Sequence, residues 1–101
     1  MAQLIYAAAA LKDLARLVDF LIDSEPAIAV EIADLIAEAI EVLGNHPLIG
    51  RPAEKGLREL IISRGHSGYI ALYSYEQPDD AVLILAIRHQ REAGYSDETN
   101  P

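Results

Sequence analysis

The chain has 101 residues, of which 51% are apolar, and its 16 acidic and 8 basic side chains give a formal net charge of −8. This length and apolar content suit one domain, residues 1–101, with its own core, and they exclude a disordered chain. The acidic balance excludes a general nucleic-acid-binding surface, and the lack of cysteine excludes disulfides and thiolate sites.

The N-terminal segment carries no basic leader before its first apolar run. Lys12, Asp13 and Arg16 then interrupt that run, so we expect no signal peptide. No apolar run approaches the ~20 residues that a membrane-spanning helix needs. We therefore expect a soluble, cytoplasmic protein that makes no membrane contact.

A short strand over residues 3–6 and a helix that continues to about residue 22 are expected to open the chain. The helix shows apolar residues at intervals of three and four, with Asp13 and Arg16 outside the apolar stripe. We expect this stripe to face the core; its members are Leu11, Leu14, Ala15, Val18, Leu21 and Ile22.

A second helix is expected from about Pro26 to Leu43, because Pro suits the first turn of a helix and Gly44 suits its end. Two amphipathic helices with a short connection predict an antiparallel hairpin. The outer face of the second helix carries an acidic stripe, which is either a solvated surface or a docking surface for a basic partner. Its members are Glu31, Asp34, Glu38 and Glu41.

Residues 45–56 are expected to form a loop, since they contain two Pro and two Gly. Three strands should follow, over residues 57–63, 69–75 and 81–87, with tight turns between them. The last is apolar at every position, which is typical of a strand buried on both faces. The order of elements predicts an α+β fold, in which an N-terminal two-helix hairpin packs on a curved antiparallel sheet of three to four strands.

The apolar third strand is followed by a nitrogen-rich run that contains Arg88, His89 and Arg91. His89 is a candidate general acid or base, and the arginines beside it can hold a phosphate. The alternative is a solvated strand end, with the tyrosines of the middle strand serving only to pack the sheet. The three histidines lie in separate segments, so we expect no metal site and no cofactor.

Several segments together resemble the RelE/ParE superfamily of toxins from type II toxin–antitoxin systems, also called plasmid stabilisation proteins. They occur in the order and at the spacing of that superfamily, over nearly the whole chain. The resemblance implies the α+β fold described above and a cognate antitoxin that wraps the toxin in a hetero-oligomer. The matching segments are AALKDL at 9–14, HPLIGRP at 46–52, LREL at 57–60, YIALYSY at 69–75 and VLILAIRHQREAGY at 82–95.

Two activities occur in the superfamily. RelE-like members cleave mRNA on the ribosome without a metal, and this role would fall to Arg64, Arg88, His89 and Tyr95 as catalytic residues. ParE-like members inhibit DNA gyrase and are not nucleases. Because a ribosome-bound nuclease needs a basic surface, the charge of −8 favours the ParE-like activity. An inactive member that only binds its antitoxin is a third alternative.

The partner surface is expected to lie between the helical hairpin and the sheet, where apolar side chains of both would meet an antitoxin segment. A tail over residues 92–101 is expected to be flexible, because it is polar and carries Tyr95 as its only apolar anchor. The residues predicted to bind a partner are Arg58, Tyr73, Arg91, Glu31, Asp34 and Glu38.

Overall fold

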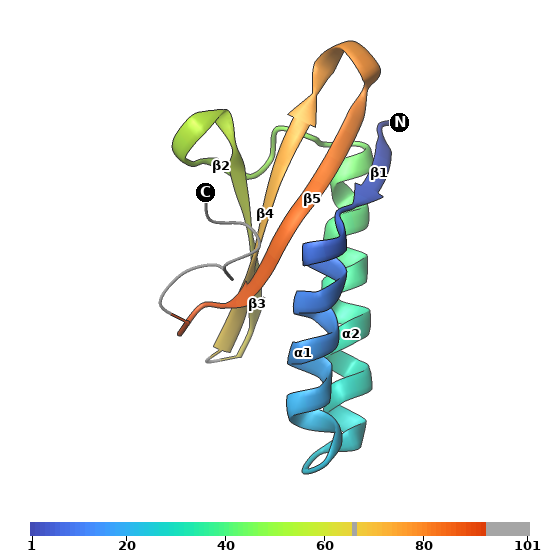
Figure 1. Cartoon of the computed structure of the whole chain (residues 1–101), viewed down its shortest axis with the longest axis vertical. Helices are drawn as coiled ribbons and strands as arrows, with labels where there is room; N and C mark the ends of the chain where they lie inside the picture. Colours follow the sequence, from blue (N-terminus) through green and yellow to red (C-terminus); the bar gives the residue numbers. More distant parts are fainter. Residues whose placement is uncertain (66, 93–101) are drawn as a thin grey trace.

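Two long helices cover one face of a five-stranded sheet in the computed structural model, which describes residues 1–65 and 67–92 (Figure 1). The helices are α1 (Ala8–Ile22) and α2 (Pro26–Glu41), joined by a short turn. The strands are β1 (Gln3–Tyr6), β2 (Arg51–Pro52), β3 (Arg58–Arg64), β4 (Ser67–Glu76) and β5 (Ala81–His89). Three short 3₁₀ turns complete the described elements: η1 (Val42–Gly44), η2 (Glu54–Gly56) and η3 (Gln77–Asp79).

The sheet confirms the predicted fold class and extends it. Its strand order is β1-β5-β4-β3-β2, and the three pairings among β2, β3, β4 and β5 are antiparallel. The pairing of β1 with β5 is parallel, so the sheet is mixed and has five strands rather than three to four. Parallel strands need a long crossover connection, and the two helices and three strands between β1 and β5 in the sequence provide one.

The strand β5 has the buried position that its apolar sequence predicts. It lies between β1 and β4, and Val82, Ile84 and Ile87 are fully buried in the core beneath the helices. Ala81 and Ala86 are buried as well. A bulge in the β4–β5 pairing falls after the Leu72–Ala86 pair, where Tyr73 pairs with Ile84 and Leu85 is the extra residue.

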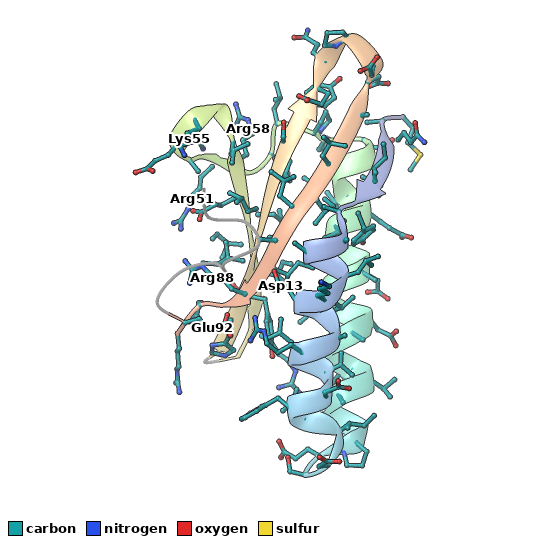
Figure 2. The ribbon with its side chains drawn as sticks, viewed as in Figure 1. Asp13, Arg51, Lys55, Arg58, Arg88 and Glu92 are labelled. Carbon is teal, nitrogen blue, oxygen red and sulfur yellow. The ribbon has the colours of Figure 1, made fainter. Side chains whose placement is uncertain are left out.

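The helix α1 is rotated about its axis relative to the predicted stripe. Ala10, Asp13 and Leu17 are its buried residues, whereas Leu11 and Ile22 are exposed. Leu14 and Leu21 of the predicted stripe do pack against the core, but the prediction was wrong for Leu11, Ile22 and Asp13, because it placed every charged residue outside. The Asp13 carboxylate instead lies between α1 and β5, where its Oδ2 accepts a hydrogen bond from the Ile87 N–H at 2.9 Å (Figure 2).

The second helix follows its prediction more closely. Pro26 occupies the first turn, Ile32, Ile36 and Ile40 are buried, and the four acidic residues of the outer stripe are exposed. Within the described part of the chain, neither this helix nor any other is long and apolar enough to cross a membrane.

Candidate functional site

A groove of about 730 Å³ opens where the turn-proximal halves of α1 and α2 meet the ends of β3, β4 and β5. The apolar lining comes from the two helices, and most of the polar lining comes from the strand ends and the turn after β5. The apolar lining is Leu17, Phe20, Leu21, Ile28 and Ile32, and the remaining lining is Arg16, Glu25, Arg64, Tyr69, His89, Arg91 and Glu92.

Phe20 stands out on the apolar wall, because it is 82% exposed, whereas Leu17 and Ile32, which also line the groove, are buried. The residue falls between Arg16 and Asp13 in the angular order around α1, on the side of the helix that faces the groove. A large aromatic side chain left in water at the mouth of an apolar hollow is typical of an interaction surface.

Two ion pairs tie the helices to β3 and to the turn after β5 beside this groove. Arg16 of α1 binds the carboxylate of Glu92 through both terminal nitrogens, and Arg64 of β3 binds Glu31 of α2. The hydrogen bond to Glu92 is the main reason that the pKa of Arg16 is raised. Because all four groups are at least partly exposed, each pair contributes little to stability, roughly 0–1 kcal/mol.

His89 lies against Tyr69 in an edge-to-face contact, with ring centroids 5.2 Å apart. Its Nδ1 accepts a hydrogen bond from the backbone N–H of Arg91 at 3.0 Å. A ring nitrogen that accepts must carry a lone pair, so the neutral imidazole has its hydrogen on Nε2. In this arrangement the ring can donate from Nε2, but its basic nitrogen is already engaged.

Arg88 lies on the opposite face of the sheet from His89. Consecutive strand residues point to opposite faces, and β5 continues through His89 rather than ending at Ile87 as predicted. The Arg88 guanidinium bonds the carbonyl oxygens of His89, Gln90 and Glu92, at 3.3, 3.4 and 3.0 Å from Nη1. It therefore fastens the turn after β5 on the side away from the helices (Figure 2).

The described residues predicted for catalysis therefore lie on two opposite faces of the sheet. Arg64 and His89 both line the groove on the helix side, and Arg88 is separated from them by the sheet. The extended β5 and its two-residue period would have predicted this separation from the sequence. Tyr95 lies outside the described residues, as do residues 93–101 of the tail predicted over residues 92–101.

Tyr73 and Arg58, both predicted to bind a partner, hold the loop before β2. Tyr73 is fully buried; its hydroxyl donates to the Pro47 carbonyl at 2.8 Å and accepts from the Gly50 N–H at 2.9 Å. Arg58 Nη1 donates to the carbonyls of Leu48 and Gly50 at 3.2 and 2.7 Å. A side chain buried as deeply as Tyr73 cannot touch a partner in this conformation, so its contribution here is structural.

Burial raises the pKa of Tyr73 above the ordinary value of 10.0, and the Gly50 hydrogen bond and the Arg58 charge partly oppose that shift. Because this pKa is higher in the folded than in the unfolded state, Tyr73 contributes to stability. That contribution is fully present below about pH 10 and is lost as the pH rises through the folded pKa. We expect the free energy of unfolding, measured with urea between pH 8 and 11, to fall above pH 10. Tyr73→Phe should make this fall shallower, and an unchanged slope would contradict the assignment.

The other predicted partner residues remain on the surface. Asp34 and Glu38 are exposed on α2, and Arg91 is exposed at the rim of the groove. Glu31 is exposed too, and it has the basic partner Arg64, which its own helix does not supply. No three His, Asp or Glu side chains converge to hold a metal ion within residues 1–65 and 67–92.

Sequence reasoning missed three residues that shape the groove: Arg16, Phe20 and Glu92. The Arg16–Glu92 pair joins residues 76 positions apart, and no local pattern indicates such a contact. The exposed Phe20 did leave a signal, because Leu17 and Phe20 are the two large apolar residues between Leu11 and Ile22 that the predicted stripe does not include.

Comparisons with known proteins agree with this fold. The family model described as the ParE toxin of the type II toxin–antitoxin system parDE matches residues 4–94. Toxin RelE3 of Caulobacter vibrioides is 37% identical over 81 residues, which are 80% of this chain and 86% of that protein.

Two solved structures share the architecture. One is a chain of the chromosomal ParDE toxin–antitoxin system of P. aeruginosa, with a TM-score of 0.73 and 25% identity over 86% of this chain and 94% of that one. The other, from the RelBE2 complex of Mycobacterium tuberculosis, has a TM-score of 0.58 and 22% identity over 88% of this chain and 98% of that one, and it supports the fold alone. The chain belongs to the ParE toxin family of type II toxin–antitoxin systems, within the RelE/ParE superfamily.

Proposed function

We propose that this toxin inhibits DNA gyrase in the cytoplasm and is neutralised by a cognate antitoxin that occupies the groove beside α1 and α2. The observation that carries the proposal is the division of Arg88 from Arg64 and His89 by the sheet. A metal-independent nuclease must gather its phosphate-binding and proton-transfer groups around one scissile bond. Here those groups lie on two faces.

The charges of the described residues support the same proposal. Arg16 and Arg64 already bind Glu92 and Glu31, and Arg88 binds backbone carbonyls, so three arginines are engaged within the molecule. Arg51 likewise pairs with Glu59, at 2.9 Å. A chain of net charge −8 with its arginines so engaged is poorly suited to ribosomal RNA, whose binding depends on phosphate neutralisation.

The experiment is a supercoiling assay with purified gyrase and DNA. We expect the toxin to inhibit supercoiling or trap a cleaved complex, and we expect pre-incubation with its antitoxin to abolish the effect. A parallel translation assay with intact ribosomes should show no cut transcripts. Normal supercoiling together with cleaved mRNA would overturn the proposed target.

The second candidate is ribosome-dependent mRNA cleavage. It is favoured by the 37% identity to a relative named Toxin RelE3 and by the shared groove position of Arg64 and His89. This candidate requires that Arg64→Ala and His89→Ala each abolish transcript cleavage in the translation assay. Cleavage that persists in both variants would remove those two residues from a catalytic role.

A further inference from the structure

The rim of the groove contains a cation that no carboxylate in the described part of the chain neutralises. Arg91 is exposed, and its side chain makes no ion pair among residues 1–65 and 67–92, in contrast to Arg16 and Arg64. Its backbone position is fixed, since its N–H donates to His89 Nδ1. The groove thus presents one available guanidinium beside an apolar wall.

We propose that this groove binds an antitoxin segment that places an acidic side chain on Arg91 and an apolar side chain against Phe20 and the helix wall. The inference rests on the proposed antitoxin partnership and specifies the chemistry of the partner. A carboxylate can form a bidentate pair with Arg91 without breaking a salt bridge between Arg91 and any of the described residues. Contact with Phe20 would remove from water a ring that is 82% exposed in the free toxin.

The composition of the groove favours a peptide over a nucleic acid. Leu17, Leu21 and Ile28 line the helix wall, and a phosphodiester backbone has no apolar group to fill the space between them. Glu25 and Glu92 also line the groove, and they would repel a run of phosphates. A single carboxylate next to an aliphatic side chain can bind Arg91 and is repelled less by Glu25 and Glu92 than a run of phosphates is.

A second copy of the toxin fits the groove less well than an antitoxin segment does. Each copy carries 16 acidic and 8 basic residues, so bringing two toxin surfaces together brings like charges together. Glu25 lines the groove near the helix turn, and Asp19 and Asp23 are exposed at the adjoining end of α1. The charges of an antitoxin segment can instead complement those of the groove, with an acidic residue at Arg91 and a basic residue near the helix turn.

The experiment measures the affinity of the full-length toxin for the protein encoded beside it, at low and high salt. We expect Arg91→Glu to weaken binding about 10- to 100-fold at low salt and much less at high salt, because exposed charges are screened. We expect Phe20→Ala to weaken binding about 10-fold or more at both salt concentrations, as an apolar anchor does. Both side chains are exposed, so neither change should lower the thermal midpoint.

Matched controls separate the groove from general effects. Lys55→Glu makes the same change in net charge on η2, outside the groove, and Leu11→Ala shortens another exposed apolar side chain of α1. Both should bind within about twofold of the parent, because changes outside an interface leave its contacts intact.

The contrary outcomes are distinguishable. If the parent toxin binds but Arg91→Glu and Phe20→Ala bind equally well, the partnership stands and the groove inference is overturned. If Phe20→Ala alone weakens binding, the acidic anchor is overturned. If the parent does not bind the neighbouring protein, the proposed partnership fails and this inference with it. If the free toxin self-associates and Phe20→Ala abolishes that association, the occupant is a second copy and the inference is overturned.

Discussion

Asp13→Ala is expected to lower the free energy of unfolding by about 2–3 kcal/mol, because it leaves a buried N–H without an acceptor. The Asp13 carboxylate supplies the hydrogen-bond acceptor that a neighbouring strand would otherwise provide at this point. The strand β1 pairs with β5 through Ile84 and then ends, and α1 crosses the remaining edge of β5. There the Ile87 N–H donates to Asp13 Oδ2 at 2.9 Å, and Asp13 is only 3% exposed.

Chemical denaturation of the parent and the variants measures this effect. Asp19→Ala is the matched control, since it removes the same functional group from an exposed position of the same helix and carries the same gain in helix propensity. Asp13→Asn should recover part of the loss, because its amide oxygen can accept from the Ile87 N–H. Equal stabilities for Asp13→Ala and Asp19→Ala would show that the bond contributes nothing.

The rotation of α1 shows that a pattern of apolar residues can predict a helix without predicting which of its sides is buried. A 3.6-residue period finds the helix, but the side that faces the sheet depends on what the sheet offers. Here β5 extends beyond its pairing with β1, and the Ile87 N–H donates to Asp13. The helix therefore turns this charged residue inward and leaves Leu11 and Phe20 in water, at 53% and 82% exposure.

The end of β5 shows the opposite case, in which the sequence held more information than the prediction used. The strand was expected to end where the apolar run ends, at Ile87. Arg88 and His89 extend it, because Ile70 and Tyr69 of β4 continue to pair with them. Strand alternation then assigns Arg88 and His89 to opposite faces, which is the feature that bears most on function.

Contacts between distant residues were not predictable from local pattern. The Tyr73 hydroxyl bonds residues 23 and 26 positions away, and the Arg64–Glu31 bond spans 33 positions. Alternating tyrosines on a strand indicate a sheet, but they do not tell which ring is buried or what its hydroxyl meets. Those answers depend on the path of residues 47–50 over the edge of the sheet.

Gly50→Ala is expected to lower the free energy of unfolding by about 3 kcal/mol or more. A Cβ at this position would lie 2.6 Å from Cε1 and from the hydroxyl oxygen of Tyr73, and 2.8 Å from the Glu59 carbonyl oxygen. Tyr73 is fully buried, so it cannot move aside without disturbing the core. Overpacking costs about 1–3 kcal/mol, and displacement of the loop would add the loss of hydrogen bonds at about 1 kcal/mol each.

Gly56→Ala is the matched control, because the same methyl group is added to a glycine where no atom lies within 4 Å of the new Cβ. Gly56 has a φ of +76°, so the control carries a backbone cost of about 1–2 kcal/mol without a steric one. Chemical denaturation should therefore rank Gly50→Ala well below Gly56→Ala in stability. If the two variants unfold at the same denaturant concentration, the close approach of Gly50 to Tyr73 does not hold this loop in place.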